Sequence, residues 1–281
     1  MPKCASVDLE ELHRLARRLD QLSHQLQQSL LGSPEMLNSN ASEKRETLPF
    51  RIRIVRNEDQ LNKAVVIRSE AYKRHWPNLS DELQTAETQD RNPNSIVFLA
   101  EHKNNSNPLG TLRIDTNLVS ALPIMRDVQL PRSISNQPFA YVTRLGVKQG
   151  AIGPLVKIAL FKSLHRYCLA KQLSWILVGV RPPNDRDYVR LGFHDILPNA
   201  GLLPITSSGG IPVRVMALET VSAERHWFES KNPLYDFMVK RFHPEIEIFS
   251  SVNGMWSQPR RENAKSTTSN SLGEAFGIPI L

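Results

Sequence analysis

The sequence predicts an α/β fold in which helices flank a mixed central sheet. Between residues 49 and 247, strand-like and helix-like apolar patterns follow one another in the order β-α-β-β-β-α-β-α-β, which is typical of a mixed sheet covered by helices. The run from Asn184 to Phe193 repeats this alternation at short range. A short helix carrying Tyr188 ends at Gly192, a residue suited to the left-handed conformation after a helix, and Phe193 begins the next strand.

The first elements of the core are a strand and a helix. Residues 50–55 alternate apolar and basic side chains, which is the period of a strand with one buried face. Residues 59–75 place Leu61 and Val65 at helical spacing, and other apolar side chains recur with the same period. Residues 77–94 are polar and show no period, so we expect an irregular segment there.

A hairpin and a further strand are expected next. Residues 95–101 are a continuous apolar run, residues 104–108 are turn formers, and residues 110–116 return as the partner strand. A long irregular excursion then leads to residues 139–147, which have the composition of another strand. The hairpin makes the sheet antiparallel in this part.

Helix and strand patterns alternate in the second half of the core. Residues 155–171 have helical spacing, residues 175–180 are a strongly apolar and therefore buried strand, and residues 213–219 form the last strand. Residues 225–242 are expected to form a terminal helix anchored by aromatic side chains.

The two ends of the chain differ from this core in composition. Residues 1–31 are expected to hold an amphipathic helix, since leucines recur at coiled-coil spacing over residues 8–31. Residues 32–48 read as a linker, residues 49–247 as the folded domain, and residues 248–281 as a flexible tail rich in Ser, Asn and Thr. The leucine stripe has two interpretations, a helix that folds back onto its own domain or a helix that forms a homodimer or binds a partner.

Composition restricts the function classes. The net charge is +7, from 35 Lys and Arg against 28 Asp and Glu, which favours acidic partners. The basic residues are scattered and no nucleic-acid-binding motif is present, so no nucleic acid partner is expected. Cys4 and Cys168 lie far apart, which suits a reducing compartment and gives no set of metal ligands. With no secretory signal and no apolar run long enough to span a bilayer, we expect a soluble cytoplasmic protein without a transmembrane segment.

Several segments together carry a family resemblance over residues 52–220. They are Arg68, Tyr72 and Trp76 on and after the first helix, Glu87 and Asp90 in the following acidic loop, Gly110-Thr-Leu-Arg113, Thr143-Arg144-Leu145-Gly146-Val147, and Tyr188 to Phe193. In order and spacing these segments resemble the GNAT acyltransferase superfamily. They look most like its branch of acyl-homoserine lactone synthases and N-acyl amino acid synthases. The resemblance implies a GNAT-like, mostly antiparallel central sheet.

The resemblance also implies roles for these residues in acyl transfer from a thioester to an amine. Tyr188 would protonate the departing thiolate as a general acid, and Glu87 and Asp90 are candidates for the base. The pantetheine arm of the thioester would lie on Leu145, Gly146, Val147, Gly150 and Gly153. The acceptor side would be lined by Arg68, Tyr72, Trp76, Arg113, Thr143 and Arg144, because an arginine fork binds a carboxylate in a bidentate manner. Ion pairing within the protein and core packing are the competing interpretations of the arginines and aromatics.

Two departures from the family pattern affect the donor and the acceptor. The segment Lys148-Gln-Gly-Ala-Ile-Gly-Pro154 stands where GNATs cradle the cofactor pyrophosphate, but its spacing differs and Pro154 has no amide donor, which argues against tight coenzyme A binding. Tyr141 stands where the lactone-synthase branch has an acid three residues before the strand arginine. The carboxylate base of lactone synthesis is therefore absent.

The sequence thus predicts an N-acyltransferase that moves a fatty acyl group from acyl carrier protein to the amine of an amino acid or related acceptor. No tightly bound cofactor is expected, and the donor is acyl-phosphopantetheine on the carrier protein or acyl-CoA. Basic residues on the helix over residues 155–171, among them Lys157, Lys162 and His165, would suit the acidic carrier. The alternatives are an acetyl-CoA-dependent N-acetyltransferase and a non-catalytic binding or scaffold module.

Overall fold

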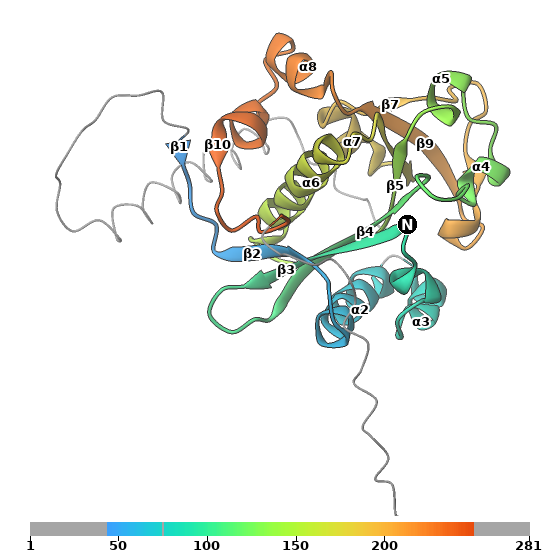
Figure 1. The fold of residues 1–281 in the computed structure, drawn as a ribbon. Coiled ribbons are helices and arrows are strands. Elements are labelled where there is room, and N and C mark those ends of the chain that lie inside the picture. The colour runs from blue at the N-terminus through green and yellow to red at the C-terminus, as the bar shows by residue number, and fades with distance from the viewer. Residues whose placement is uncertain (1–43, 75, 250–281) are drawn as a thin grey trace, which may run out of the picture.

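The computed structural model describes residues 44–74 and 76–249. The leucine-striped segment over residues 8–31 and the tail beyond residue 249 lie outside the described residues, so their predictions stand untested. Along the described chain the structure shows a mixed α/β fold (Figure 1). No helix in this part of the chain is long and apolar enough to cross a membrane.

The first half of the chain contributes one strand of a separate two-stranded sheet, one long helix and the antiparallel half of the central sheet. Its elements are β1 (Lys44–Arg45), β2 (Phe50–Ile54), α2 (Glu58–Lys73), α3 (Pro77–Glu82), the 3-10 turn η1 (Thr88–Arg91), β3 (Ser95–His102), β4 (Pro108–Thr116), α4 (Ile124–Asp127) and α5 (Arg132–Ser135).

The second half adds the strands that complete the sheet and the helix that covers it. Its elements are β5 (Phe139–Val147), α6 (Gly153–Ala170), β6 (Trp175–Val180), α7 (Asp185–Arg190), β7 (His194–Asp195), β8 (Leu203–Pro204), η2 (Thr206–Ser208), β9 (Pro212–Glu219), α8 (Ala223–Glu229), the π-helical turn η3 (Asp236–Lys240) and β10 (Arg241–Phe242).

The central sheet has the strand order β2-β3-β4-β5-β6-β9-β7, with β8 also paired to β9. Only the central pair, β5 with β6, is parallel, and every other pair in this sheet is antiparallel. The prediction of a mixed, mostly antiparallel sheet flanked by helices is therefore confirmed. Strands β5 and β6 are parallel because α6 connects them. A crossover helix carries the chain back to the end of the sheet at which β5 began, so β6 runs in the same direction.

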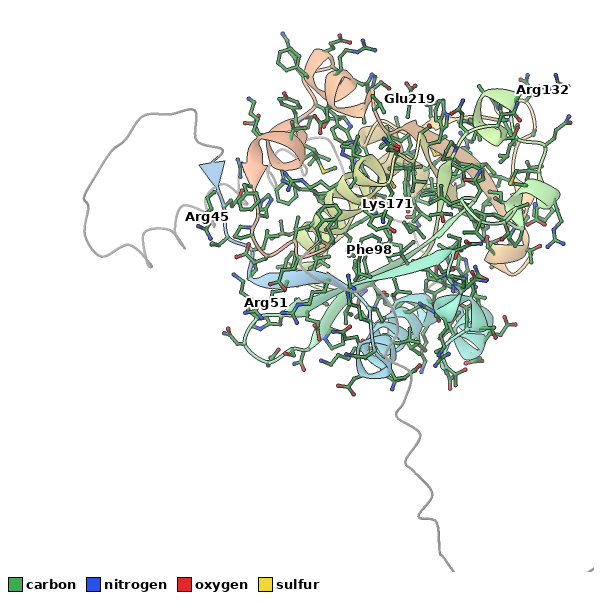
Figure 2. All side chains as sticks on the ribbon, viewed as in Figure 1. Arg45, Arg51, Phe98, Arg132, Lys171 and Glu219 are labelled. Atoms are coloured by element: carbon green, nitrogen blue, oxygen red, sulfur yellow. The ribbon has the colours of Figure 1, made fainter. Side chains whose placement is uncertain are left out.

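Helices cover both faces of the sheet. In Figure 1, α6 lies over one face and α2 with α3 over the other. Along β3 the side chains alternate accordingly, since Phe98 packs into the cluster that contains the α6 residues while Val97 and Leu99 pack into the cluster formed with α2. Phe98, labelled in Figure 2, is fully buried between the sheet and α6. Burial on both faces explains why these strands are apolar without interruption.

The two central strands of the sheet separate part-way along their length. Strands β5 and β6 pair from Phe139–Trp175 to Val142–Val178, and then separate although β5 continues to Val147. Arg144 has φ of 54°, and the register between β4 and β5 shifts at the same place. Such a bulge bends a strand and redirects its side chains. The separation leaves the β6-facing backbone of the last β5 residues without a strand partner.

The structure corrects the expected limits of three segments. The terminal helix over residues 225–242 is broken, because Pro233 has no amide to continue it and Lys231 takes φ of 51°. The predicted C-terminal limit of the linker over residues 32–48 is too late in the chain, since Leu48 is buried in the core and Lys44–Arg45 pairs with β10. Residues 77–94 were expected to be irregular but contain α3 and η1.

The basic face predicted for the helix over residues 155–171 is also corrected. Lys162 is fully buried and donates to the backbone carbonyls of Phe237 and Arg241, while His165 is only 3% exposed. Lys162 thus binds the segment around η3 and β10, and His165 lies against the carbonyl of Thr220. They are therefore not available to an acidic partner.

His165 makes stability depend on pH. Burial lowers its pKa from the usual 6.5, and its Nε2 lies 3.0 Å from the carbonyl oxygen of Thr220. The unfolded chain takes up a proton near pH 6.5 while the folded chain does not, so stability is lost as the pH falls below 6.5. We expect the loss to approach about 1 kcal/mol per pH unit.

The measurement is urea unfolding at pH 7.5, 6.5 and 5.5 for the wild type and for His165→Gln, whose side chain does not titrate in this range. The variant should show a flatter pH dependence, whereas substitution of the exposed His226 by Gln should leave the wild-type slope. Equal slopes in wild type and His165→Gln would contradict the assignment.

Candidate active site

A pocket of about 280 Å³ opens where β5 and β6 separate. Its walls come from β5, β6, the end of α2, the start of α7 and the segment over residues 205–213. Of the residues predicted from the sequence to form the site, the pocket is lined by Tyr72, Trp76, Thr143, Arg144, Leu145, Gly146, Val147 and Tyr188. Residues that were predicted from separate segments therefore meet around one cavity.

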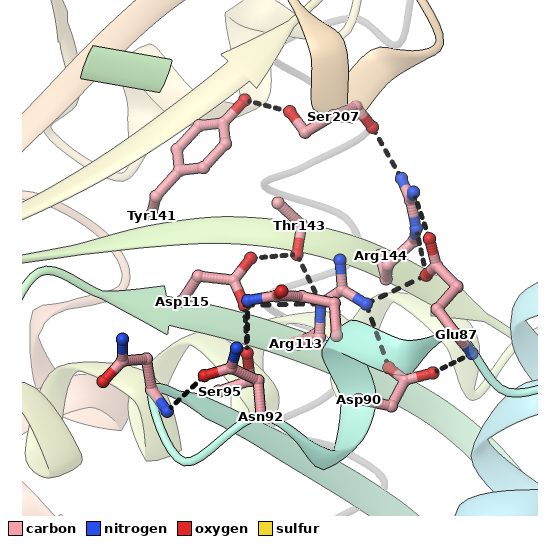
Figure 3. A network of polar contacts seen from close by, with 12 residues as sticks. Glu87, Asp90, Asn92, Ser95, Arg113, Asp115, Tyr141, Thr143, Arg144 and Ser207 are labelled. Carbon is pink, nitrogen blue, oxygen red and sulfur yellow. Dashed lines mark hydrogen bonds and ion pairs between the residues drawn. The ribbon is translucent and has the colours of Figure 1, made fainter. Parts of the chain in front are cut away.

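Arg144 connects this pocket to the acidic loop. Its left-handed backbone places its guanidinium against Glu87, to which Nε and an Nη donate at 2.7 and 2.6 Å. The other Nη donates to the carbonyl of Ser207 at 2.7 Å (Figure 3). Burial alone would lower the pKa of Arg144, but the hydrogen bonds and charge of Glu87 outweigh it and raise that pKa. Arg144 is thus a permanent, fixed cation in the pocket wall.

Behind the pocket, two further arginines hold the same acidic loop. Arg68 is fully buried and binds Asp90 in a bidentate manner at 2.9 and 2.8 Å. Arg113 donates from one nitrogen to Glu87 at 2.9 Å and to Asp90 at 3.0 Å, and from Nε to Thr143 at 3.0 Å. Figure 3 shows the two carboxylates lying beside the guanidinium groups of Arg113 and Arg144. The cluster joins α2, η1, β4 and β5.

The local fold of η1 positions the two carboxylates. The Asp90 side chain accepts from the amide of Glu87 at 2.8 Å, forming half of a capping box at the start of the turn. Burial would raise the pKa of each carboxyl, but hydrogen bonds and charges from the arginines hold the pKa of Glu87 and of Asp90 below their usual values. Neither residue lines the pocket. Both carboxylates stay ionised and are weak proton acceptors.

Tyr188 forms another wall of the pocket and is 8% exposed. Its ring packs edge-to-face against Phe161 and Phe193, and the Lys157 ammonium lies 5.6 Å from its centroid. The turn expected after α7 is present, because Gly192 has φ of 92° and the amide of Phe193 donates to the carbonyl of Tyr188. Burial raises the pKa of the Tyr188 hydroxyl, so it remains protonated above its usual range.

The sequence reasoning missed one wall of the pocket. The Tyr141 hydroxyl and the Ser207 hydroxyl lie 2.8 Å apart, and both residues line the pocket. Gly179 allows this approach, because a Cβ there would lie 3.0 Å from the Tyr141 hydroxyl and 2.7 Å from Ile205. The Tyr141 position had a signal, since an aromatic replaces the acid of the resembling branch. Ser207 had none, because turn-forming residues do not indicate which strand they contact.

The predicted glycines of the next loop lie outside the pocket lining. Gly150 takes φ of 114°, and the amide of Gly153 already donates to the carbonyl of Gly150 at 3.1 Å. A Cβ at Gly153 would lie 2.5 Å from the carbonyl oxygen of Lys148, so the tight turn itself requires this glycine. The loop is built for its own turn, and it offers an anion fewer amides than a full phosphate cradle. Among the described residues there is no group of side chains that could hold a metal ion.

No protein-family model and no curated protein matches this sequence. A solved structure with a similar arrangement is FeeM, an N-acyl amino acid synthase from uncultured soil microbes, at 17% identity and a TM-score of 0.49, covering 67% of this chain and 98% of FeeM. Another is BjaI, a CoA-dependent acyl-homoserine lactone synthase, at 13% identity and a TM-score of 0.48, covering 69% of this chain and 93% of BjaI. The acyl-homoserine lactone synthase LasI gives 14% identity and a TM-score of 0.41, covering 61% and 90%. At these identities and scores, function does not follow from the likeness.

Proposed function

We propose that this chain is an N-acyltransferase that moves a fatty acyl group from an acyl carrier protein thioester to the amine of an amino acid or related acceptor. The observation that carries the proposal is the pocket between the separated ends of β5 and β6, with Tyr188 in one wall and Arg144 in another. Acyl transfer needs a thioester held in an extended form, a polarised carbonyl and a proton for the leaving thiolate. The pocket offers a group for each.

The donor would lie along the free edge of β5. Leu145, Gly146 and Val147 line the pocket beyond the last residue pair with β6. Their β6-facing backbone groups can pair with an extended pantetheine arm as a strand would, and an amide there can polarise the thioester carbonyl. Gly146 allows α2 to pack against this strand, because a Cβ there would lie 3.1 Å from the Ala71 Cβ. The close packing of α2 therefore supports this part of β5.

Tyr188 would protonate the departing thiolate. Its burial keeps the hydroxyl protonated at neutral and moderately alkaline pH, which is the state that a general acid requires. Among the described residues, no Asp or Glu lines the pocket. The amine therefore enters neutral, or loses its proton to water, before direct attack on the thioester. No covalent intermediate on the protein is needed.

Arg144 would hold the acceptor through its carboxylate. Glu87 and Ser207 occupy three of the five guanidinium N–H bonds, the Tyr72 hydroxyl lies within hydrogen-bonding reach of the same guanidinium, and the side chain lines the pocket. The remaining N–H bond can donate to the carboxylate of an amino acid. In this proposal Glu87 and Asp90 act by fixing Arg144, Arg113 and Arg68. As the C–N bond forms and the C–S bond breaks, the thiolate takes the Tyr188 proton, and the proton lost by the attacking nitrogen returns to the Tyr188 phenolate through water.

The test is an assay of the purified chain with long-chain acyl carrier protein and pooled amino acids, with N-acyl products detected by mass. The same acyl group on coenzyme A, and acetyl-CoA, are run in parallel. We expect N-acyl amino acids from the carrier-bound donor. We also expect about tenfold less product when the acceptor is an amino acid amide, since the amide cannot make the charged pair with Arg144.

Prompt turnover of acetyl-CoA, with no product from the carrier, would show the acetyltransferase alternative instead. If the chain turns over no donor but still binds acyl carrier protein, the result would indicate a non-catalytic binding module. Equal rates with the amino acid and its amide would remove the role given to Arg144.

A further inference from the structure

Away from the pocket, aromatic side chains are exposed on α8 and on the segment that leads to β10. Phe228 on α8 is 63% exposed, and its ring lies against that of Tyr235 with a centroid distance of 5.5 Å. Phe242 on β10 is 38% exposed. The preceding residue of α8, Trp227, is buried, so this short helix directs one aromatic ring into the core and the next into solvent. We call Phe228 and Tyr235 the aromatic patch, because adjoining exposed apolar side chains of this kind mark an interaction site.

Residues 1–43 join the described chain beside this patch. The first described strand, Lys44–Arg45, pairs in parallel with Arg241–Phe242, and Figure 1 shows β1 next to β10. The amide of Glu46 extends the pairing by donating to the carbonyl of Phe242 at 2.9 Å. Because the two strands are parallel, the chain before β1 arrives from the side of Lys240, whose Nζ lies 5.2 Å from the Tyr235 ring centroid. The N-terminal segment is therefore tethered close to the aromatic patch.

The tethered segment carries the leucine stripe, an apolar face that requires a partner. The stripe consists of leucines at the spacing of one helix face, namely Leu12, Leu15, Leu19, Leu22 and Leu26. An isolated helix of about 15 residues is marginal in water, so a face of this length needs an apolar surface to pack against. Residues 32–43 connect the stripe to β1. A linker of that length spans about 20 Å on average and about 40 Å at most, which keeps the stripe near the patch.

We propose that the leucine stripe over residues 8–31 docks on the aromatic patch of its own chain. The leucine face packs over Phe228 and Tyr235 and takes the exposed ring of Phe228 out of water. The tether selects the same chain over a second copy, because a short linker gives the stripe an effective concentration in the millimolar range. The stripe is thus an intramolecular element that covers α8, and a homodimer is not required to bury it. This docking is independent of the proposed acyl transfer.

The experiment is hydrogen exchange of the full chain, followed by mass spectrometry of its peptides. In the wild type, amides over residues 12–26 should exchange at least about tenfold more slowly than in the isolated peptide, and Phe228→Ser should remove most of this protection. Val119→Ser is the matched control, since Val119 is 77% exposed in the loop after β4 and lies outside the patch. Leu19→Ser should in return speed exchange over α8, whereas Gln21→Ser, which lies off the stripe, should not.

Sedimentation velocity distinguishes docking on the same chain from docking on a second copy. We expect a monomer whose protection is the same from about 1 to 100 µM, because these concentrations lie below the effective concentration of the tethered stripe. A dimer whose protection rises with concentration would assign the stripe to a second copy and overturn the proposal.

Three exchange results would also overturn it. They are an unprotected stripe in the wild type, full protection in Phe228→Ser, and an equal loss in Phe228→Ser and Val119→Ser. If Phe228→Ser fails to fold, Leu19→Ser against Gln21→Ser decides, because neither change alters the domain over residues 49–247.

Discussion

Replacing Asp90 by Asn is expected to lower the free energy of unfolding by about 3–5 kcal/mol, the usual cost of removing one partner from a buried ion pair. Asp90 is 1% exposed and receives the fully buried Arg68 in a bidentate manner and Arg113 at 3.0 Å. The neutral amide leaves the buried Arg68 with a single carboxylate contact, 3.2 Å from Glu87, and Glu87 is already shared with Arg113 and Arg144. Urea unfolding at pH 7 measures the effect directly.

Glu58→Gln provides the matched control for this prediction. Glu58 also binds an arginine in a bidentate manner, Arg91, at 2.8 and 2.7 Å, but its side chain is 56% exposed. An exposed pair contributes little, so a loss below about 1 kcal/mol is expected. A comparable loss in both variants would contradict the idea that burial makes the Asp90 cluster essential.

The Asp90 contribution also has a defined dependence on pH. The arginines hold the pKa of Asp90 below its usual value despite the opposing effect of burial. A depressed folded-state pKa gives stability that is present above the unfolded pKa, about 3.9 for Asp, and is lost as the pH falls through the folded value. The difference in stability between wild type and Asp90→Asn should therefore be constant from pH 7 to 5 and shrink below pH 4.

The fold was largely predictable because its buried strands can be recognised in the sequence by their apolar pattern. In β3, Val97 and Leu99 face one helix layer and Phe98 the other, and this two-sided burial is written in the sequence as an unbroken apolar run. The end of the chain was less predictable, although Pro233 marks the break in the expected terminal helix. The prediction gave more weight to the helical spacing of the aromatic side chains than to Pro233, which cannot donate the backbone hydrogen bond that a continuing helix needs.

The site was predictable as a set of residues but not as a set of contacts. Arg144 and Glu87 were both identified, yet they are far apart in the chain, and no local pattern shows that one neutralises the other. The contact depends on the left-handed backbone at Arg144 and on the bulge beside it, which are tertiary features. For the same reason the wall formed by Ser207 could not be found from its turn-forming neighbours.

Replacing Tyr188 by Phe is expected to reduce kcat for acyl transfer by about 10²- to 10⁴-fold, the usual contribution of a positioned general acid, with little change in KM. The fold should persist, because the hydroxyl makes no hydrogen bond with any residue that the structure describes and phenylalanine keeps the ring contacts with Phe161 and Phe193. The measurement is steady-state transfer with the donor identified above, together with the melting temperature of each variant.

Tyr167→Phe is the matched control for Tyr188→Phe. Tyr167 lies in α6, is also 8% exposed, and packs edge-to-face on Phe98, but it does not line the pocket. Burial raises its pKa to about 12, so Tyr167 shares with Tyr188 its low exposure and the direction of its pKa shift but lies away from the pocket. Tyr167→Phe should retain wild-type kcat. An equal fall in both variants would show that the effect comes from packing and not from the pocket.

The pH profile separates a proton donor from a residue that only shapes the pocket. Because burial raises the pKa of Tyr188 above its usual 10.0, the hydroxyl stays protonated while the acceptor amine loses its proton. The rate should therefore rise from pH 7 toward pH 9 and show no fall before pH 10. Tyr188→Phe should keep the rising limb, since the amine still titrates, at a uniformly lower rate. A fall in wild-type activity below pH 9 that is absent in Tyr188→Phe would mean that the tyrosine ionises too early to serve as the acid.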